Sequence, residues 1–398
     1  MNEPLRSAVE MWEGGWDEAG LAEFAADVRR RLGDNAVTFG LVFATPDFFA
    51  HAREMLELLR VHAQIPVLAG CSTSGLVVNG REVEQAGGLV LGLFSLPGAT
   101  VQPVIFGSAG DAGRTAREAL GEDAPVTGWL AFVEPFHTDS EEWIQSWQAA
   151  FPDRPIYGGL AMGAPGEAVA QVYCNGEVLE TGGVALAVSG IRILGAVAQG
   201  CTPVGETWTI TRTEGNIIHR IGNRPAVAVL EETFGELDEE RRRRSRGSFF
   251  AGLAVDEYVE SHGRGDFLVR NLVGADPDSG ALAIAASPRP GQTMQFQMRD
   301  AAAADEDIRR VLGRLRDEAG RSRVLGGCMA VCVGRGEGLF GETGHDAALV
   351  RQIIGPIGVA GFFCNGEFGP VGRRSFVHGY TASLLLFVAE VGAAGDEL

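Results

Sequence analysis

The sequence predicts an α+β protein with mixed, largely antiparallel sheets that are covered by helices. Short apolar runs typical of strands alternate along the chain with amphipathic segments of helical spacing. Many of the apolar runs are joined by short glycine turns, which favours paired antiparallel strands over a plain strand–helix–strand series. The same order of elements also returns along the chain, so we expect internal repeats of a strand-helix-strand-turn-strand-strand unit.

The first copy of this unit follows an acidic amphipathic helix that we expect at 17–31. Its own helix opens at Thr45-Pro46, because threonine is a favoured N-cap and proline is favoured at the first helical position. A small-residue turn at 70–75 (GCSTSG) ends its second strand. The expected strands of this copy are 36–43, 66–70, 76–78 and 88–94.

Two further copies follow. In the second copy, the segments 155–159 and 182–186 echo 66–70 and 87–91 at a spacing of about 90 residues. Its helix is expected to begin at Thr138, which forms a capping box with Glu141 after a strand at 126–133. The third copy has expected strands at 324–333, 356–363 and 379–390 and a helix at 345–353. A degenerate copy is expected in between, with strands at 207–212, 267–272, 282–285 and 294–298 and helices at 226–234 and 301–319.

Length and charge restrict the class of protein. A chain of 398 residues exceeds one ordinary core and predicts two domains of roughly 150–200 residues each. The formal net charge of −19 argues against nucleic acid or an anionic membrane as the main partner. Every one of the 33 basic residues is arginine, so chemistry that needs a lysine, such as Schiff-base formation or a P-loop phosphate grip, is excluded.

The chain is expected to be cytoplasmic. It begins with neither a basic nor an apolar signal segment, and its apolar runs fall short of a membrane span. Its six cysteines are scattered through apolar surroundings, which favours buried thiols over disulfides. Cys328 and Cys332 share a face of one expected strand but would lie about 13 Å apart, too far for one zinc ion. We therefore expect no metal site and no cofactor.

Four motifs in register resemble one known family. The turn 70–75 with Gly87-Gly88 downstream resembles the N-terminal FIST domain, and the segments 331–336, 361–363 and 365–367 resemble the C-terminal FIST domain. The stretches 213–216 and 223–226 are similar to the passage between the two halves. The resemblance covers roughly residues 34–390. It implies a FIST N-terminal domain at 34–222 and a FIST C-terminal domain at 223–390. Outside it we expect an N-terminal helical segment at 1–33, from its amphipathic pattern, and a tail at 391–398.

This resemblance implies a function as well as a fold. FIST proteins are described as intracellular sensory modules that bind small ligands such as amino acids. The sequence carries no kinase, cyclase or methyl-accepting segment, so we expect the signal to pass through a separate, unknown protein partner. The predicted ligand is a small polar metabolite. The sequence does not predict an oligomeric state.

Seven residues at the small-residue turns are the expected ligand-binding site, because strand-end loops on a rigid scaffold commonly carry binding. The first turn offers hydroxyl and backbone amide groups for a carboxylate or phosphate. Arg335 would hold an anionic group, and it lies close enough to Cys332 to lower the pKa of that thiol. The tight turn at Asn365-Gly366 presents a carboxylate for a donor group. The expected residues are Cys71, Ser72, Thr73, Cys332, Arg335, Asn365 and Glu367.

Two other functions fit the same residues. Cys332 or Cys71 could be the nucleophile of a hydrolase or an amide-transfer enzyme, and rapid alkylation of one thiol near neutral pH would favour that interpretation. An interaction scaffold without any ligand is the other alternative. A ligand that binds only the folded state raises the melting temperature, which separates a sensor from a scaffold.

Overall fold

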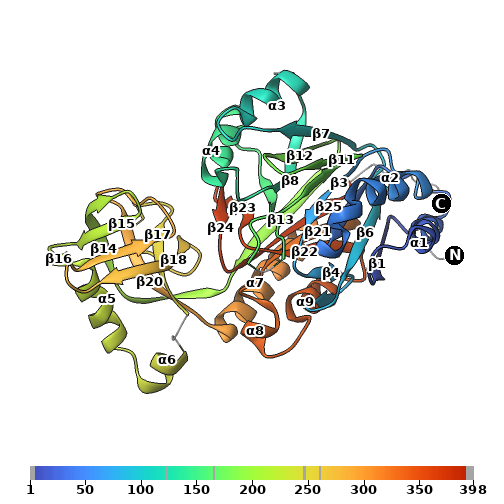
Figure 1. Cartoon of the computed structure of the whole chain (residues 1–398). Helices are drawn as coiled ribbons and strands as arrows, with labels where there is room; N and C mark the ends of the chain where they lie inside the picture. Colours follow the sequence, from blue (N-terminus) through green and yellow to red (C-terminus); the bar gives the residue numbers. More distant parts are fainter. Residues whose placement is uncertain (1–4, 122–123, 165, 245–247, 260, 391–398) are drawn as a thin grey trace. The chain divides into compact units, whose positions relative to one another are not determined.

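A computed structural model describes the chain except for residues 1–4, 122–123, 165, 245–247, 260 and 391–398. It confirms the predicted fold class, with mixed and largely antiparallel sheets covered by helices (Figure 1). The chain forms two compact units. The first comprises Met1–Ala198, Ile308–Val377 and Thr381–Leu398, and the second comprises Gln199–Asp307 and His378–Tyr380. The predicted tail, 391–398, lies outside the described residues.

Three six-stranded sheets in the first unit have equivalent strand orders. Each has two parallel strands at its centre, joined through helices, as parallel neighbours require. The central pairs are β2 (Phe39–Ala44) with β3 (Leu68–Ser72), β8 (Val126–Val133) with β9 (Ile156–Leu160), and β21 (Val324–Cys332) with β22 (Val359–Cys364). Antiparallel strands extend one side of each pair, namely β6 (Gly88–Phe94) and β1 (Ser7–Glu13), β12 (Gly183–Ser189) and β7 (Thr100–Phe106), and β25 (Thr381–Val388) and β13 (Arg192–Gln199).

A pair of short strands extends the other side of each sheet, and it always comes from elsewhere in the sequence. The pair β4–β5 (Leu76–Val78, Arg81–Val83) follows β3 in the chain but joins β22. The pair β10–β11 (Val172–Cys174, Glu177–Leu179) follows β9 but joins β3. The pair β23–β24 (Glu367–Val371, Arg374–His378) follows β22 but joins β9. Each sheet therefore needs the chain of another, which ties the three into one unit.

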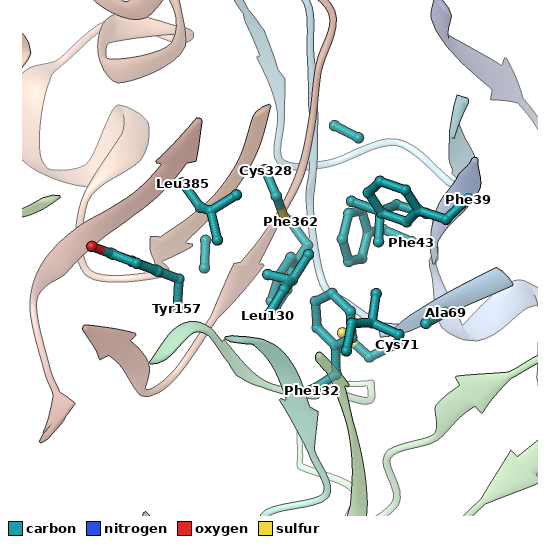
Figure 2. Packing of buried hydrophobic residues seen from close by; sticks show 14 of the residues in the cluster. Phe39, Phe43, Ala69, Cys71, Leu130, Phe132, Tyr157, Cys328, Phe362 and Leu385 are labelled. Carbon is teal, nitrogen blue, oxygen red and sulfur yellow. The ribbon is translucent and has the colours of Figure 1, made fainter. Parts of the chain in front are cut away.

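The inner faces of the three sheets share one core. Phe43 on β2, Phe132 on β8 and Phe362 on β22 form a triangle, one ring from each sheet, with ring centroids 4.5, 5.4 and 5.6 Å apart. Figure 2 shows these rings with Cys71 and Cys328 among them. Aromatic pairs at such separations stabilise a core beyond the area they bury. This cluster is the centre of the first unit.

Helices cover the outer faces of the three sheets, each through its own apolar cluster. Trp143 and Trp147 of α4, for example, pack against Trp129 of β8. The helices are α1 (Glu18–Arg31), η1 (Pro46–His51) and α2 (Ala52–His62) on the first sheet, α3 (Ala112–Leu120) and α4 (Ser140–Ala150) on the second, and α7 (Ala301–Ala319), α8 (Gly336–Phe340) and α9 (His345–Ile353) beside the third.

The second unit is a seven-stranded sheet in the order β14-β20-β17-β18-β19-β15-β16. Its strands are β14 (Cys201–Glu214), β15 (Ile217–Ile221), β16 (Arg224–Pro225), β17 (Phe249–Ala254), β18 (Phe267–Asp276), β19 (Ala281–Ile284) and β20 (Thr293–Arg299), with α5 (Ala226–Gly235) and α6 (Glu239–Arg244) as helices. Its order differs from that of the other three sheets, so the expected degenerate copy does not have their arrangement. The internal repeat itself, inferred from sequence offsets, stays a prediction.

Two local predictions differ from the structure. The segment 1–33, expected as helical, also contains β1, because its Ala8 and Val9 are buried where the strand pairs with β6. Helix α4 is capped by Asp139, which accepts hydrogen bonds from the backbone N–H groups of Glu141 and Glu142. The Thr138 hydroxyl instead accepts a hydrogen bond from the N–H of Gly182, so tertiary structure displaced the expected cap by one residue.

Within the described ranges, the helices are too short or too polar to cross a membrane.

Candidate functional site

The first unit has a cavity of about 500 Å³ where strands of all three sheets end. Thr45 follows β2, Ser74 and Gly75 follow β3, and Gly163 and Ala164 follow β9. The third sheet contributes the residue after β21 and one at the end of β22. Since the carboxyl ends of neighbouring parallel strands meet at one edge, the topology itself assembles this lining. The described lining residues are Thr45, Pro46, Asp47, Ser74, Gly75, Glu84, Gln85, Ala86, Gly87, Gly163, Ala164, Val333 and Phe363.

Carboxylates give the cavity its charge. Asp47 lies in the first turn of η1, and its Oδ2 accepts a hydrogen bond of 2.7 Å from the Thr45 hydroxyl. Glu84 follows β5, and its Oε1 accepts one of 2.8 Å from the backbone N–H of Glu337. Both acids are therefore oriented by neighbours and keep further lone pairs for a ligand. Among the described residues of the lining there is no arginine, lysine or histidine.

Two glycines of the lining approach neighbouring side chains closely. A Cβ atom on Gly87 would lie 2.6 Å from Oδ2 of Asp47, and one on Gly75 would lie 2.8 Å from the Phe363 ring. Contacts that short force a neighbour to move. The two glycines thus let the β5–β6 connection and the turn after β3 approach the cavity without displacing Asp47 or Phe363.

The expected residues of the first turn precede the cavity-lining Ser74 in the chain and do not line the cavity themselves. Cys71, Ser72 and Thr73 are all fully buried. The Ser72 hydroxyl accepts a hydrogen bond from the N–H of Gln171. The Thr73 hydroxyl oxygen lies 2.6 and 2.7 Å from the carbonyl oxygens of Gly75 and Phe363, joining β3 to β22. These groups position the turn whose next residue, Ser74, lines the cavity.

The thiols are deeply buried. Burial and the neighbouring Cys328 raise the pKa of Cys71 well above its ordinary value, so its thiolate is disfavoured. Cys332 is 2% exposed, and its sulfur accepts a hydrogen bond from the N–H of Gly334. The six cysteines are all free and buried, as the composition predicts.

Arg335 is fully buried and already paired. Its Nε and Nη2 donate hydrogen bonds of 2.5 and 3.0 Å to the two carboxylate oxygens of Asp346, and its guanidinium lies over the Phe340 ring. Burial alone would raise the pKa of Asp346, but Arg335 and His345 lower it overall. Asp346 therefore supplies the anionic group that we expected from a ligand. Among the residues that the structure describes, Arg335 Nη1 and Oε2 of the nearby Glu82 are buried and have no hydrogen-bond partner.

Asn365 and Glu367 differ in burial although they belong to one turn. Asn365 is exposed, whereas Glu367 is fully buried. Oε1 of Glu367 accepts hydrogen bonds from the Cys364 thiol and the Gly366 N–H, and Oε2 accepts from the N–H and hydroxyl of Thr381. The turn leads from β22 in one sheet to β23 in another, so it is not the tight hairpin that Asn365-Gly366 predicts.

The structure thus buries six of the seven expected residues at or just beyond the ends of β3 and β21 and at the start of β23, and none of the seven lines the cavity. Their role as ligand contacts stays a prediction. Sequence reasoning missed Asp47 and Glu84. Asp47 lies in the first turn of a helix, where an acid is ordinary because it suits the helix dipole, so its position did not point to a ligand. Nothing in the sequence marks Glu84, because its strand pair joins a sheet built mostly from residues beyond 323.

Comparisons with known proteins agree with this architecture. The FIST N domain matches residues 38–224, and the FIST C domain matches residues 226–370. "Uncharacterized protein Rv0628c" of Mycobacterium tuberculosis is 33% identical over 378 residues, covering 92% of this chain and 95% of its own length. "Uncharacterized protein Mb0898c" of Mycobacterium bovis is 30% identical over 379 residues, covering 93% and 95%. The chain therefore belongs to the FIST family, with both of its domains in the order that its motifs indicate.

Proposed function

We propose that this protein is a sensor that reversibly binds a small metabolite carrying a protonated amine in the strand-end cavity of its first unit. FIST domains are associated with sensing and ligand binding. The observation that carries the proposal is the charge of the lining, which holds Asp47 and Glu84 and, among its described residues, no basic side chain. A ligand ammonium group would gain charge-assisted hydrogen bonds from both carboxylates.

The rest of the lining fits a small polar ligand. The hydroxyls of Thr45 and Ser74 and the amide of Gln85 offer further hydrogen bonds, while Phe363 and Val333 offer apolar contact. A volume of about 500 Å³ is within the usual range for small-molecule sites. Amines with a second cationic or hydroxyl group, such as diamines and basic amino acids, suit this lining best. An acidic amino acid would place its side-chain carboxylate against Asp47 or Glu84.

Binding rather than catalysis is favoured by the thiols. Cys71 and Cys332 are buried and do not line the cavity, and burial raises the pKa of the Cys71 thiol. A nucleophilic cysteine needs an accessible sulfur and a lowered pKa. We further propose that the protein acts in the cytoplasm and passes its signal to a separate protein partner.

The test is a thermal-shift screen followed by calorimetry with putrescine, ornithine and arginine, and with 1,4-butanediol and glutamate as uncharged and acidic controls. We expect at least one amine to raise the melting temperature and the controls to leave it unchanged. The double variant Asp47→Asn with Glu84→Gln keeps the size of both side chains and should weaken binding about 10-fold or more.

A matched variant, Asp153→Asn with Glu118→Gln, removes the same charge at two exposed positions away from the cavity. It should bind the amine like the unmodified protein. The proposal is wrong if none of the three amines binds, or if the cavity variant and the matched variant bind equally well.

A further inference from the structure

A second cavity in the first unit has the opposite charge. It measures about 300 Å³ and lies at the amino ends of β21 and β22, beside β1. Four arginines from four separate parts of the chain line it, with one acidic residue among its described lining. In a chain with a formal net charge of −19, four arginines around one small space call for a physical reason. The arginines are Arg6, Arg31, Arg323 and Arg351, and the acid is Glu10.

Two of these arginines, Arg6 and Arg351, contact only neutral groups in the described part of the chain. Arg31 forms an ion pair of 2.5 Å with Glu10. Arg6 donates a hydrogen bond of 3.1 Å to the neutral side chain of Asn35, and Arg351 donates one of 3.2 Å to the backbone carbonyl of Asn79. In the part of the chain that the structure describes, neither Arg6 nor Arg351 has a carboxylate partner. Like charges brought together without a counter-charge repel one another, and a bound anion would remove that cost.

The base of the cavity is fixed by hydrogen bonds rather than by loosely packed loops. Asn79 donates to the carbonyl of Val9 at 2.6 Å and accepts from the N–H of Val359 at 3.3 Å. The Ser7 hydroxyl accepts from the N–H of Gly358 at 3.0 Å. These bonds join β1, the β4–β5 turn and the start of β22. The positions from which the arginine side chains extend are therefore set by the fold, as a preorganised site requires.

We infer that this cavity binds a small metabolite that carries one phosphate group or two adjacent phosphate groups. The planar guanidinium group presents parallel N–H donors that match phosphate oxygens, and it stays charged at every physiological pH. Several arginines around one small space supply more positive charge than a single carboxylate would neutralise. The volume suits one or two phosphate groups with a small substituent. This site differs from the amine site in position, lining and charge, so the two proposals stand or fall separately.

The test uses inorganic pyrophosphate as the probe, with inorganic phosphate and citrate for comparison at matched ionic strength, in calorimetric titrations of the full chain that are repeated at higher sodium chloride concentrations. We expect saturable binding of pyrophosphate that is tighter than that of citrate and weakens as sodium chloride is raised. The variant Arg6→Gln with Arg351→Gln should weaken binding at least about 10-fold. Glu10→Gln removes the acid and frees Arg31, so it should tighten binding by about 3-fold or more.

A matched variant separates a site from general charge attraction. Arg114→Gln with Arg373→Gln removes the same charge at two exposed arginines outside this cavity, and it should bind pyrophosphate like the unmodified chain. Melting temperatures measured without probe show whether each variant is folded, and Glu10→Gln tests the site even where the arginine variant is destabilised. The inference is overturned if pyrophosphate does not bind saturably, if citrate binds more tightly, or if Glu10→Gln leaves the affinity unchanged or weaker.

Discussion

Glu82 and Glu367 are buried acids of the first unit, and both have pKa values raised from the ordinary 4.5 to about 7. Glu82 is 6% exposed on β5, and burial and then the neighbouring Asp346 raise its pKa to about 7. Burial also raises the pKa of Glu367 to about 7, although the Thr381 and Cys364 side chains and two backbone N–H groups partly offset this. At pH values between its unfolded and its folded pKa, such an acid holds its proton in the folded state and has released it in the unfolded chain. The free energy of unfolding therefore falls as the pH rises from about 4.5 towards 7.

This effect predicts the behaviour of Glu82→Gln. The neutral amide has the shape of the protonated acid, and it cannot ionise. It should leave stability nearly unchanged at pH 5 and raise the free energy of unfolding by about 1 to 3 kcal/mol at pH 8. Urea unfolding of both proteins at the two pH values, followed by tryptophan fluorescence, measures the difference.

Glu23→Gln, at an exposed position of α1, is the control and should change stability equally at both pH values. Some pH dependence should remain in Glu82→Gln because Glu367 still titrates. If the variant showed the same loss of stability between pH 5 and pH 8 as the unmodified chain, Glu82 would not be the group responsible.

At the scale of elements, the pair Arg335–Asp346 joins the end of β21 to the first turn of α9. Both side chains are completely buried. His345 adds a contact of 2.9 Å to Asp346 and stacks on Phe340, whose ring also faces Arg335. The sequence suggested that Arg335 binds a ligand, because Asp346, its partner within the chain, is 11 residues away on a separate helix. Only the packing of α9 onto the third sheet brings that partner into place.

Removing one partner of a buried ion pair destabilises a protein far more than replacing both partners with apolar residues. Asp346→Asn should therefore lower the free energy of unfolding by about 3 to 5 kcal/mol, because it leaves the Arg335 charge buried and uncompensated. The double variant Arg335→Met with Asp346→Leu, which removes both charges, should be less destabilised than Arg335→Met and Asp346→Leu added together. A double-mutant cycle by urea unfolding gives the coupling energy, and additive effects would contradict this role for the pair.

At the scale of the whole molecule, the exchange of strand pairs makes the first unit interdependent. Every one of its sheets is completed by a pair that follows the central strands of another sheet. The second unit takes no part in that exchange, and its main segment runs from Gln199, the last residue of β13, to Asp307 within α7. Ala198 and Ile308, which flank this segment, belong to one apolar cluster of the first unit. The two points at which the chain leaves and re-enters the first unit therefore lie close together.

We therefore expect the first unit to fold without the second. A chain in which residues 199–307 are replaced by a short glycine–serine linker should unfold in one cooperative transition and should keep both cavities. Circular dichroism during heating, with the amine and pyrophosphate titrations described above, measures this. Loss of the cooperative transition would show that the second unit is needed for folding.

A chain that stops at residue 370, where the family match ends, is the informative contrast. It lacks β25, which lies between β13 and β21 and is buried along its whole length. We expect this truncated chain to be unfolded although it loses fewer residues than the linker variant.

The amino-acid sequence by itself determined the elements and the family. Apolar periodicity and turn residues placed most of the helices and strands, including α1 and α9, because these depend on neighbours a few residues away. Four local motifs were enough to indicate both FIST domains, which the family matches confirm.

Only the tertiary structure decided how those elements exchange partners and what surrounds the cavities. Asp47 and Glu84 come together because a strand pair that follows β3 crosses to another sheet, and no local pattern encodes that crossing. Arg335 and Glu367 have local sequences typical of binding turns, yet long-range packing buries both and supplies Asp346 and Thr381 as partners. Charge placement in a site depends on contacts between residues far apart in the chain, and therefore it follows from the fold and not from the motifs.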